Sequence, residues 1–386
     1  MTLQGKKIAI VGGGPGGLTL ARLLQLAGAD ITVYERDADK SARVQGAPLD
    51  LHETSGLAAL AKAGLMQAFK DNFMPGADRM KIMDEHATVF YSNHDTKQAE
   101  NFGHPHFRPE IDRGVLRRIL LGSLQPGTIL WGSHFLDMQQ EAAGWRLNFK
   151  DRPSAYADIV IAADGARSKL RPYVTGIKAF YTGITMLEGN IYDAQTAAPH
   201  MAALLASGKI MAFGKGQDLL MGQKADGEIG FYASFKADAG WAQQSGLDFA
   251  DRAAVLQWFR AAYPDWSSLW HELFERATLP FIPRPIYCMP LDQSWAALPN
   301  LTLIGDAAHL MPPFAGEGVN MAMLDALELS TCLTEGDYAT VHEAIAAYEA
   351  RMRSRASAIA RESLDNGERM HSATALATML DFFGGH

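Results

Sequence analysis

The chain has 386 residues, 48% of them hydrophobic, so it can bury one large core or two moderate ones. Its net charge of −8 gives no electrostatic basis for binding nucleic acid or an acidic membrane. The two cysteines, Cys288 and Cys332, are too few and too far apart for a disulfide framework, and no apolar run is long enough to predict a membrane span. These features predict a cytoplasmic protein, and nothing in them demands more than a monomer.

The N-terminal segment predicts a strand–helix–strand unit. Residues 7–11 form an apolar, β-branched run, residues 18–27 have leucines at helical spacing, and residues 30–36 return as a second strand. The turn between the first strand and the helix has the pattern Gly12-x-Gly14-x-x-Gly17. In such a unit the first glycine makes a tight turn, the second lets a pyrophosphate approach the backbone, and the third lets the helix pack on the strand.

An acidic residue completes this pattern. Glu35 ends the second strand, where a carboxylate can bind ribose hydroxyls, and the helix N-terminus offers N–H groups to phosphates. The unit therefore predicts dinucleotide binding. Arg36 follows the acid and Arg43 comes seven residues later, and the motif alone leaves FAD and NAD as alternatives.

Two later turns have related features. A predicted strand at 159–163 ends at Asp164-Gly165, and another at 301–304 ends at Gly305-Asp306, where the carboxylate can accept from ribityl or ribose hydroxyls. A loop with two prolines and two glycines, residues 312–318, then precedes a helix from about Val319, so it aims backbone N–H groups toward the positive end of that helix. His309 is expected to pack or hydrogen-bond rather than to catalyse.

Together the three motifs resemble the single-component aromatic-hydroxylase flavoproteins, which have the fold of para-hydroxybenzoate hydroxylase. The motifs are GxGxxG with its terminal Glu, DGxxSxxR at 164–171, and GDAAH…PP…GxGxN at 305–320. The stretches ARVQGAPLDLHETSG, GDAAHLMPPFAGEGVN and FYASFK resemble more closely still the TetX-type tetracycline-inactivating monooxygenases. The resemblance implies an α/β fold: a Rossmann-like FAD-binding domain with an inserted β-sheet substrate domain and a long C-terminal helix.

The resemblance also implies where FAD would bind. It places Glu35 at the adenosine ribose, Asp306 near the ribityl chain, and Arg43 and Asp50 by the isoalloxazine, with Arg43 also contacting NADPH. Arg113 matches an FAD-contacting arginine, although a surface charge paired to a neighbouring acid is the alternative. No side chain is expected to be catalytic, because the flavin performs the chemistry. The expected cofactor-binding set is Gly12, Gly14, Pro15, Gly16, Gly17, Glu35, Arg36, Arg43, Asp50, Arg113, Asp164, Asp306, Pro313, Gly316, Gly318, Val319 and Asn320.

The organisation that follows has three parts. Residues 1–75, 103–177 and 278–330 are expected to form a discontinuous FAD-binding domain, and residues 76–102 and 178–277, which contain strand-like runs separated by glycines, a substrate-binding domain. Residues 331–386 are expected to form a helical region bridging both, with four arginines on its solvated face: Arg351, Arg353, Arg355 and Arg361.

The substrate strands depart from the TetX-type pattern. Members of that group grip tetracycline with a glutamine, an arginine and a histidine, where this chain has Glu188, Lys209 and Gly230. Lysine lacks the planar fork of arginine and glycine lacks a ring, so polar recognition would have to differ. The residues expected to line the substrate side are Glu188, Lys209, Met211, Phe213, Met221, Phe314 and Met370.

The resemblance implies a reaction. NADPH would reduce FAD, O2 would add to give a C4a-hydroperoxide, and the distal oxygen would pass to an electron-rich phenol or enol carbon. Tetracycline inactivation is the narrower expectation, with hydroxylation of another aromatic or polyketide substrate and a non-catalytic flavin redox sensor as alternatives. A single GxGxxG argues against classes with a second nucleotide domain, and the tryptophan motif of flavin halogenases does not occur. No metal is expected, because the His104-Pro105-His106 segment lacks a third ligand at suitable spacing.

Overall fold

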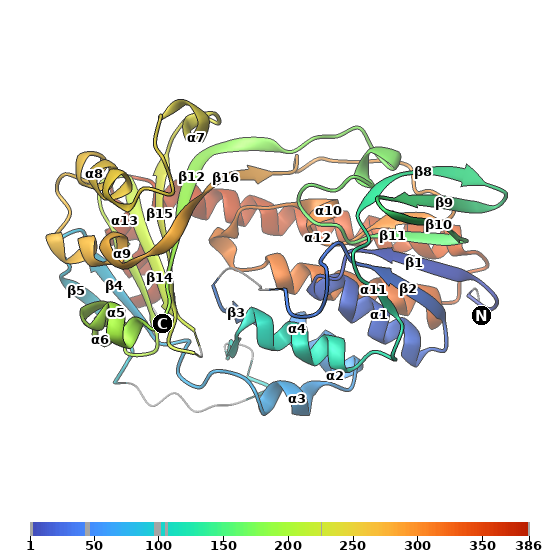
Figure 1. Cartoon of the computed structure of the whole chain (residues 1–386). Helices are drawn as coiled ribbons and strands as arrows, with labels where there is room; N and C mark the ends of the chain where they lie inside the picture. The colour runs from blue at the N-terminus through green and yellow to red at the C-terminus, as the bar shows by residue number, and fades with distance from the viewer. Residues whose placement is uncertain (1–2, 43–46, 96–101, 105–106, 225, 385–386) are drawn as a thin grey trace.

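The structure, a computed structural model, describes residues 3–42, 47–95, 102–104, 107–224 and 226–384. Figure 1 shows two halves, each built on its own sheet, with the long helix α12 (Val341–Met370) running across both. The half that contains the N-terminus holds a parallel sheet, and the other half holds a larger, mainly antiparallel one.

The parallel sheet has the strand order β17-β11-β1-β2-β7. Its strands are short and almost wholly buried, because α1 (Pro15–Leu26) and α11 (Gly318–Thr334) pack with an antiparallel meander, β8 to β10, into the core around it. The strands of these two sheets are β1 (Lys7–Val11), β2 (Asp30–Tyr34), β7 (Ile129–Leu130), β11 (Ile159–Ala162), β17 (Leu301–Leu303), β8 (Phe135–Glu141), β9 (Gly144–Phe149) and β10 (Arg152–Ala157).

The second sheet has the order β16-β12-β15-β14-β13-β4-β5, with only β13 and β4 paired in parallel. One face packs on the helices α5 to α9, and the other faces the parallel-sheet half. The elements are β4 (Met80–Asp84), β5 (Val89–Ser92), β12 (Phe180–Ile191), β13 (Lys209–Phe213), β14 (Gln217–Gln223), β15 (Ile229–Lys236), β16 (Thr278–Cys288), α5 (Ala194–Ala197), α6 (Pro199–Leu205), α7 (Trp241–Gln244), α8 (Arg252–Ala262) and α9 (His271–Arg276).

The remaining elements connect the halves and close the C-terminal end. A two-stranded sheet pairs β3 with β6, and α13 packs on β4, β5 and β13. The bounds are β3 (Leu49–Asp50), α2 (Gly56–Lys62), α3 (Met66–Lys70), β6 (Glu110–Ile111), α4 (Arg113–Gly122), α10 (Asp306–His309) and α13 (Ala375–Gly384), with short 3-10 turns at Arg171–Tyr173, Ser268–Trp270 and Pro313–Ala315.

Two expectations differ from the structure. Residues 278–288, expected in the FAD-binding domain, form β16 and pair with β12 of the seven-stranded sheet. This segment carries three prolines, which an edge strand tolerates because one side of its backbone has no ladder partner. The arginines of α12 are also not all solvated: Arg355 pairs with the buried carboxylate of Asp325, and Arg353 lies over the Trp295 ring.

Candidate active site

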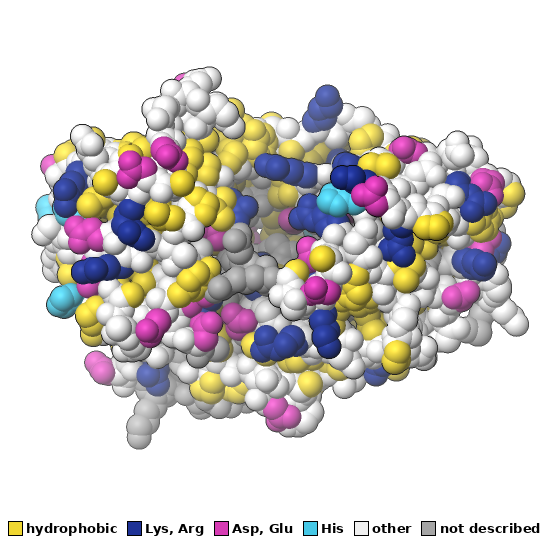
Figure 2. Space-filling model, in the orientation of Figure 1, with side chains coloured by type: hydrophobic (Ala, Val, Ile, Leu, Met, Phe, Trp, Pro, Cys, Tyr) yellow, Lys and Arg dark blue, Asp and Glu magenta, His cyan; other side chains and the backbone are white. Residues whose placement is uncertain are grey.

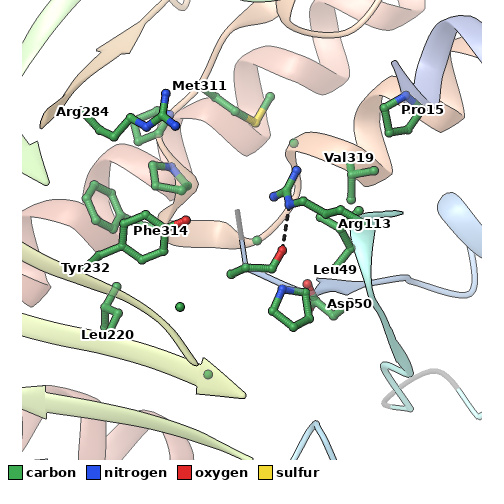
Figure 3. Close-up of a pocket in the computed structure, with 18 of the residues that line it drawn as sticks. Pro15, Leu49, Asp50, Arg113, Leu220, Tyr232, Arg284, Met311, Phe314 and Val319 are labelled. Carbon is green, nitrogen blue, oxygen red and sulfur yellow. Dashed lines mark hydrogen bonds between the residues drawn. The ribbon is translucent and has the colours of Figure 1, made fainter. Parts of the chain in front are cut away.

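A cavity of about 720 Å³ lies between the two halves. Figure 2 shows the surface hollowed there, with charged side chains of both signs beside the hollow. Residues from all three sequence motifs line it, together with residues of the seven-stranded sheet. In Figure 3, Pro15, Val319 and Arg113 lie on one side of this cavity, and Arg284, Tyr232 and Leu220 lie on the other.

The glycine turn has the geometry that its spacing predicts. Gly12 has φ +113°, and a Cβ there would lie 2.2 Å from the carbonyl oxygen of Ala163, so only glycine fits. A Cβ on Gly17 would lie 2.2 Å from the carbonyl oxygen of Gly12, which explains how closely the helix approaches the strand end. Gly14 differs, because a Cβ there would meet nothing within 4 Å and Gly14 lines the cavity. Pro15, Gly16 and Gly17 line it as well.

Glu35, which follows β2, binds the glycine turn on the side away from the cavity. Glu35 accepts hydrogen bonds from the backbone N–H of Gly13 at 2.5 Å and of Asp37 at 2.9 Å, and it is buried outside the cavity lining. Arg36 is exposed and does not line the cavity either. Arg43 lies outside the described residues.

The second and third motifs contact each other directly. Arg171 donates from Nη1 to the carbonyl oxygens of Ala307 and Ala308, both at 2.7 Å, so it holds the turn that follows Gly305. Burial lowers the pKa of Arg171 to about 10. Asp164 accepts from the backbone N–H of Lys169 at 2.7 Å, and burial raises the pKa of its carboxyl. Asp164 is not part of the cavity lining, although its neighbour Gly165 is.

Asp306 exposes its carboxylate to the cavity although protein surrounds it. Burial raises the pKa of Asp306, and the charges of His309 and Arg113 only partly offset this. Gly305 precedes it with φ +59° and ψ −143°, a conformation that only glycine adopts without strain.

A buried network that sequence reasoning missed holds this turn. Asp325 of α11, which is 0% exposed, accepts from the backbone N–H of Gly305 at 2.8 Å and contacts His309 Nε2 at 2.6 Å. Arg355 donates to its other oxygen at 2.7 Å and to Glu328 at 2.6 Å. Burial opposes both charges, yet their mutual attraction lowers the pKa of Asp325 and raises that of His309. His309 is therefore a hydrogen-bonding residue, as expected.

The proline–glycine loop lies against β3 at the edge of the cavity. Pro313, Gly316, Gly318 and Val319 line the cavity, as does Asp50 of β3. The first turn of α11 has no side-chain cap, so its N–H groups remain available to a ligand.

Two further side chains join this loop to β3. His52 contacts Asp50 Oδ2 with Nε2 at 3.1 Å and Glu317 Oε1 with Nδ1 at 2.9 Å. Asn320, expected to bind the cofactor, instead donates to the carbonyl oxygen of Asp50 at 3.0 Å and accepts from the backbone N–H of His52 at 3.0 Å. It lies outside the cavity lining, so its contacts are those of a structural residue.

Arg113, at the start of α4, reaches into the cavity (Figure 3). Its Nε donates to the carbonyl oxygen of Ala47 at 2.7 Å. The neighbouring acids are engaged elsewhere: Asp112 caps α4, and Glu110 contacts Lys209 Nζ. Burial lowers the pKa of Arg113, while the charge of Asp306 acts in the opposite direction.

The seven-stranded sheet supplies the opposite wall. Strand pairing aligns Glu188, Tyr232, Leu220 and Met211 in one row across β12, β15, β14 and β13, and the pleat turns these side chains toward the cavity. Lys209 lies in the next row, where burial lowers its pKa. Phe314 and Met370 complete the apolar part.

Two residues expected here have other positions. Phe213 is fully buried and is not in the cavity lining, because it packs with Ile82, Met370 and Ala375 where α13 covers that end of the sheet. Met221 borders the cavity, but its side chain belongs to the core on the far face of the sheet. Period-two alternation from Leu220 and Gly222 would have predicted this.

Arg284 and Tyr232 also line the cavity, although the sequence did not predict them there. Arg284 lies between two prolines in β16, an unusual place for a charged residue in an apolar segment, and that was the available signal. Within the described ranges no group of three or more His, Cys, Asp or Glu side chains is arranged to hold a metal ion, and no helix there is long and apolar enough to cross a membrane.

A family model described as FAD binding domain matches residues 6–213 and 298–363. A monooxygenase of Emericella nidulans, asqM, is 29% identical over 376 residues, which cover 84% of this chain and 83% of that protein.

Solved structures show the same fold. HpxO of Klebsiella pneumoniae complexed with FAD and uric acid aligns with TM-score 0.78 and 22% identity, over 99% of this chain and 93% of that one. The tetracycline destructase Tet(51) aligns with TM-score 0.71 and 18% identity, over 98% and 94%. The predicted para-hydroxybenzoate hydroxylase-type fold is confirmed.

Proposed function

Because the chain belongs to the FAD binding domain family, we propose that it is an FAD-dependent monooxygenase that uses NADPH and O2 to hydroxylate an electron-rich phenol or enol carbon. The observation that carries this proposal is one cavity lined by three sequence motifs on one side and by a partly apolar sheet on the other. Such a cavity can hold a dinucleotide and a small organic substrate against each other.

The residues present fit FAD. Gly14 leaves space for a pyrophosphate at the start of α1, whose first turn has no side-chain cap, and Asp306 offers a carboxylate to sugar hydroxyls. The N-terminus of α11 offers uncapped N–H groups and a positive dipole end to the electron-rich edge of the ring system. FAD, when bound, supplies the activation of O2 and the transfer of one oxygen atom. The protein binds, orients and excludes water.

On the substrate side, tetracycline inactivation remains a proposal within this function. Motif resemblance supports it, and the Tet(51) likeness is one of fold alone. Glu188, Lys209 and Gly230 would require polar contacts different from those of the TetX-type pattern. The alternative is an aromatic or polyketide substrate of another kind.

The test is an assay of the purified protein with tetracyclines, anthracyclines and simple phenols. We expect a yellow protein that oxidises NADPH faster than NADH, consumes O2 and forms a product one oxygen atom heavier than its substrate. NADPH oxidation that yields only peroxide with every compound would reject the panel as substrates. A yellow protein that oxidises neither nicotinamide would favour a flavin redox sensor, and a protein that takes up no flavin would refute the proposal.

A further inference from the structure

Glu188 lies on the cavity wall formed by the seven-stranded sheet, which we call the substrate wall. Among the described residues it is the acid of this wall that has only one of its two carboxylate oxygens in a hydrogen bond. It is 3% exposed and lines the cavity. Its Oε2 accepts a hydrogen bond from Arg284 Nε at 2.7 Å, whereas its buried Oε1 has no hydrogen-bond partner in the described chain. A buried carboxylate oxygen without a donor is costly, so the site suits a ligand that brings a donor.

The ionisable side chains around Glu188 determine the net charge at this position. The ionisable groups that face Glu188 are Arg284 of β16, Tyr232 on β15 and, from the opposite side of the cavity, Arg113. Burial and the charge of Glu188 raise the pKa of the Tyr232 hydroxyl, so this neighbour stays protonated. Lys209 is paired with Glu110 instead. Glu188 and Arg284 thus form a locally neutral pair with one acceptor atom open to the cavity.

We propose that Glu188 is a catalytic residue: its Oε1 accepts the hydroxyl proton of a phenolic or enolic substrate as the neighbouring carbon is oxygenated. Arg284 is a positioning residue that fixes the carboxylate through the hydrogen bond from its Nε to Oε2. The inference rests on the proposed function and narrows the substrate to one that presents an O–H group to this wall.

Atoms and electrons balance in this step. The substrate O–H bond breaks, its proton moves to Glu188 Oε1, and its electron pair forms a C=O bond while the adjacent carbon gains one oxygen atom of O2. The other oxygen atom leaves as water, reduced by the two electrons of NADPH. When the proton on the oxygenated carbon is lost to water, Glu188 returns its proton to the carbonyl oxygen, and the hydroxylated product and the carboxylate are both regenerated.

Binding tests the contact without turnover. The dissociation constant of 4-nitrophenol for the yellow holoprotein is measured by equilibrium dialysis one pH unit below and one above the pKa of this phenol. We expect the protein to bind the neutral phenol, hence about tenfold weaker binding at the higher pH. Glu188→Gln should reverse this preference, because Arg284 then stands unpaired and attracts the phenolate.

Two other variants make the result specific. Glu228→Gln removes a carboxylate from a buried ion pair with Lys224 outside the cavity lining, and it should keep the tenfold preference. Arg284→Gln should also keep it, because the carboxylate still repels the phenolate. An unchanged preference in Glu188→Gln, tighter binding of the phenolate by the unmodified protein, or no binding of 4-nitrophenol would overturn the inference.

Turnover gives a second measure. With the compound that the panel shows to be oxygenated, Glu188→Gln should lower kcat by about 10²- to 10⁴-fold while NADPH oxidation continues and yields peroxide. Unchanged product formation would also overturn the inference. Because dialysis needs neither NADPH nor O2, failure of the oxygenation assay leaves the binding result interpretable. Conversely, an unaltered Glu188→Gln enzyme would leave the proposed function standing.

Discussion

The contact of His52 with two carboxylates predicts how the stability of the protein depends on pH. Asp50 and Glu317 face the two ring nitrogens, and since both nitrogens must donate, the imidazole is held in its charged form. Burial disfavours that charge, but the hydrogen bonds and charges of the two acids outweigh it and raise the pKa of His52 from 6.5 to about 9.

The sign and size of the effect follow from linkage. A group whose pKa is higher in the folded state contributes stability that is fully present below its unfolded pKa and is lost as the pH rises through its folded pKa. The shift from 6.5 to about 9 corresponds to roughly 3 kcal/mol at about 1.36 kcal/mol per pH unit. This contribution should be present near pH 6 and absent near about pH 10.

The perturbation is His52→Gln, which keeps a polar side chain but cannot carry the charge. Urea unfolding across this pH range should show the variant less stable than the unmodified protein by roughly 3 kcal/mol at the acid end, with the difference shrinking toward zero at the alkaline end. His342→Gln, at an exposed position on α12, serves as control and should show no such trend. A difference between His52→Gln and the unmodified protein that stays constant with pH would refute this reasoning.

Three more tests, with five substitutions, address other parts of the structure. Gly14→Val should fold, because its side chain enters the cavity, yet the variant should lose bound FAD. Gly17→Val should unfold the domain, because its side chain meets the Gly12 carbonyl. Flavin absorbance and circular dichroism together separate the two outcomes. Arg355→Gln leaves Asp325 buried and partly unpaired, so urea unfolding should show a loss of about 3–5 kcal/mol, whereas the exposed Arg361→Gln should change stability by less than about 0.5 kcal/mol. Equal losses in both would contradict this role of Arg355. Asp218 is fully buried, its Oδ2 lies 3.3 Å from His371 Nε2, and neither of its oxygens accepts a hydrogen bond from the described residues. Burial raises its pKa far above 3.8, so Asp218→Asn should become more stable relative to the unmodified protein as pH rises above about 4, by up to about 1.4 kcal/mol per pH unit. A pH-independent difference would show that Asp218 is ionised, as a partner of a charged His371 would be.

The nucleotide half could be predicted because its signals are local. A Cβ on Gly12 or Gly17 would clash with a backbone carbonyl oxygen, Gly14 leaves the cavity open, and the strands before each turn are short apolar runs. The position of Glu35 at the end of β2 is also a local signal. The sequence predicts that its carboxylate binds ribose hydroxyls, whereas in the structure the carboxylate accepts a hydrogen bond from the backbone N–H of Gly13 in the glycine turn.

The substrate wall could be predicted only in part. Lys209, Met211 and Phe213 share one face of β13 by alternation, and only the packing of α13 decides that Phe213 is core and Met211 is wall. Arg284 meets Glu188 across 96 positions of sequence, and that contact depends on the register between β12 and β16. No local pattern encodes such a register.

Helix α12 connects the seven-stranded sheet to the parallel sheet. Near its start, Glu349 and Tyr348 bond to β17, and just past its end His371 contacts Ser234 of β15 at 2.6 Å. One added residue in the middle of this rod would rotate its far end by about 100°. The tip would swing away from Ser234, and the two walls of the cavity would lose their alignment although every cavity residue kept its identity. The number of residues in α12 therefore determines how the two walls of the cavity are aligned.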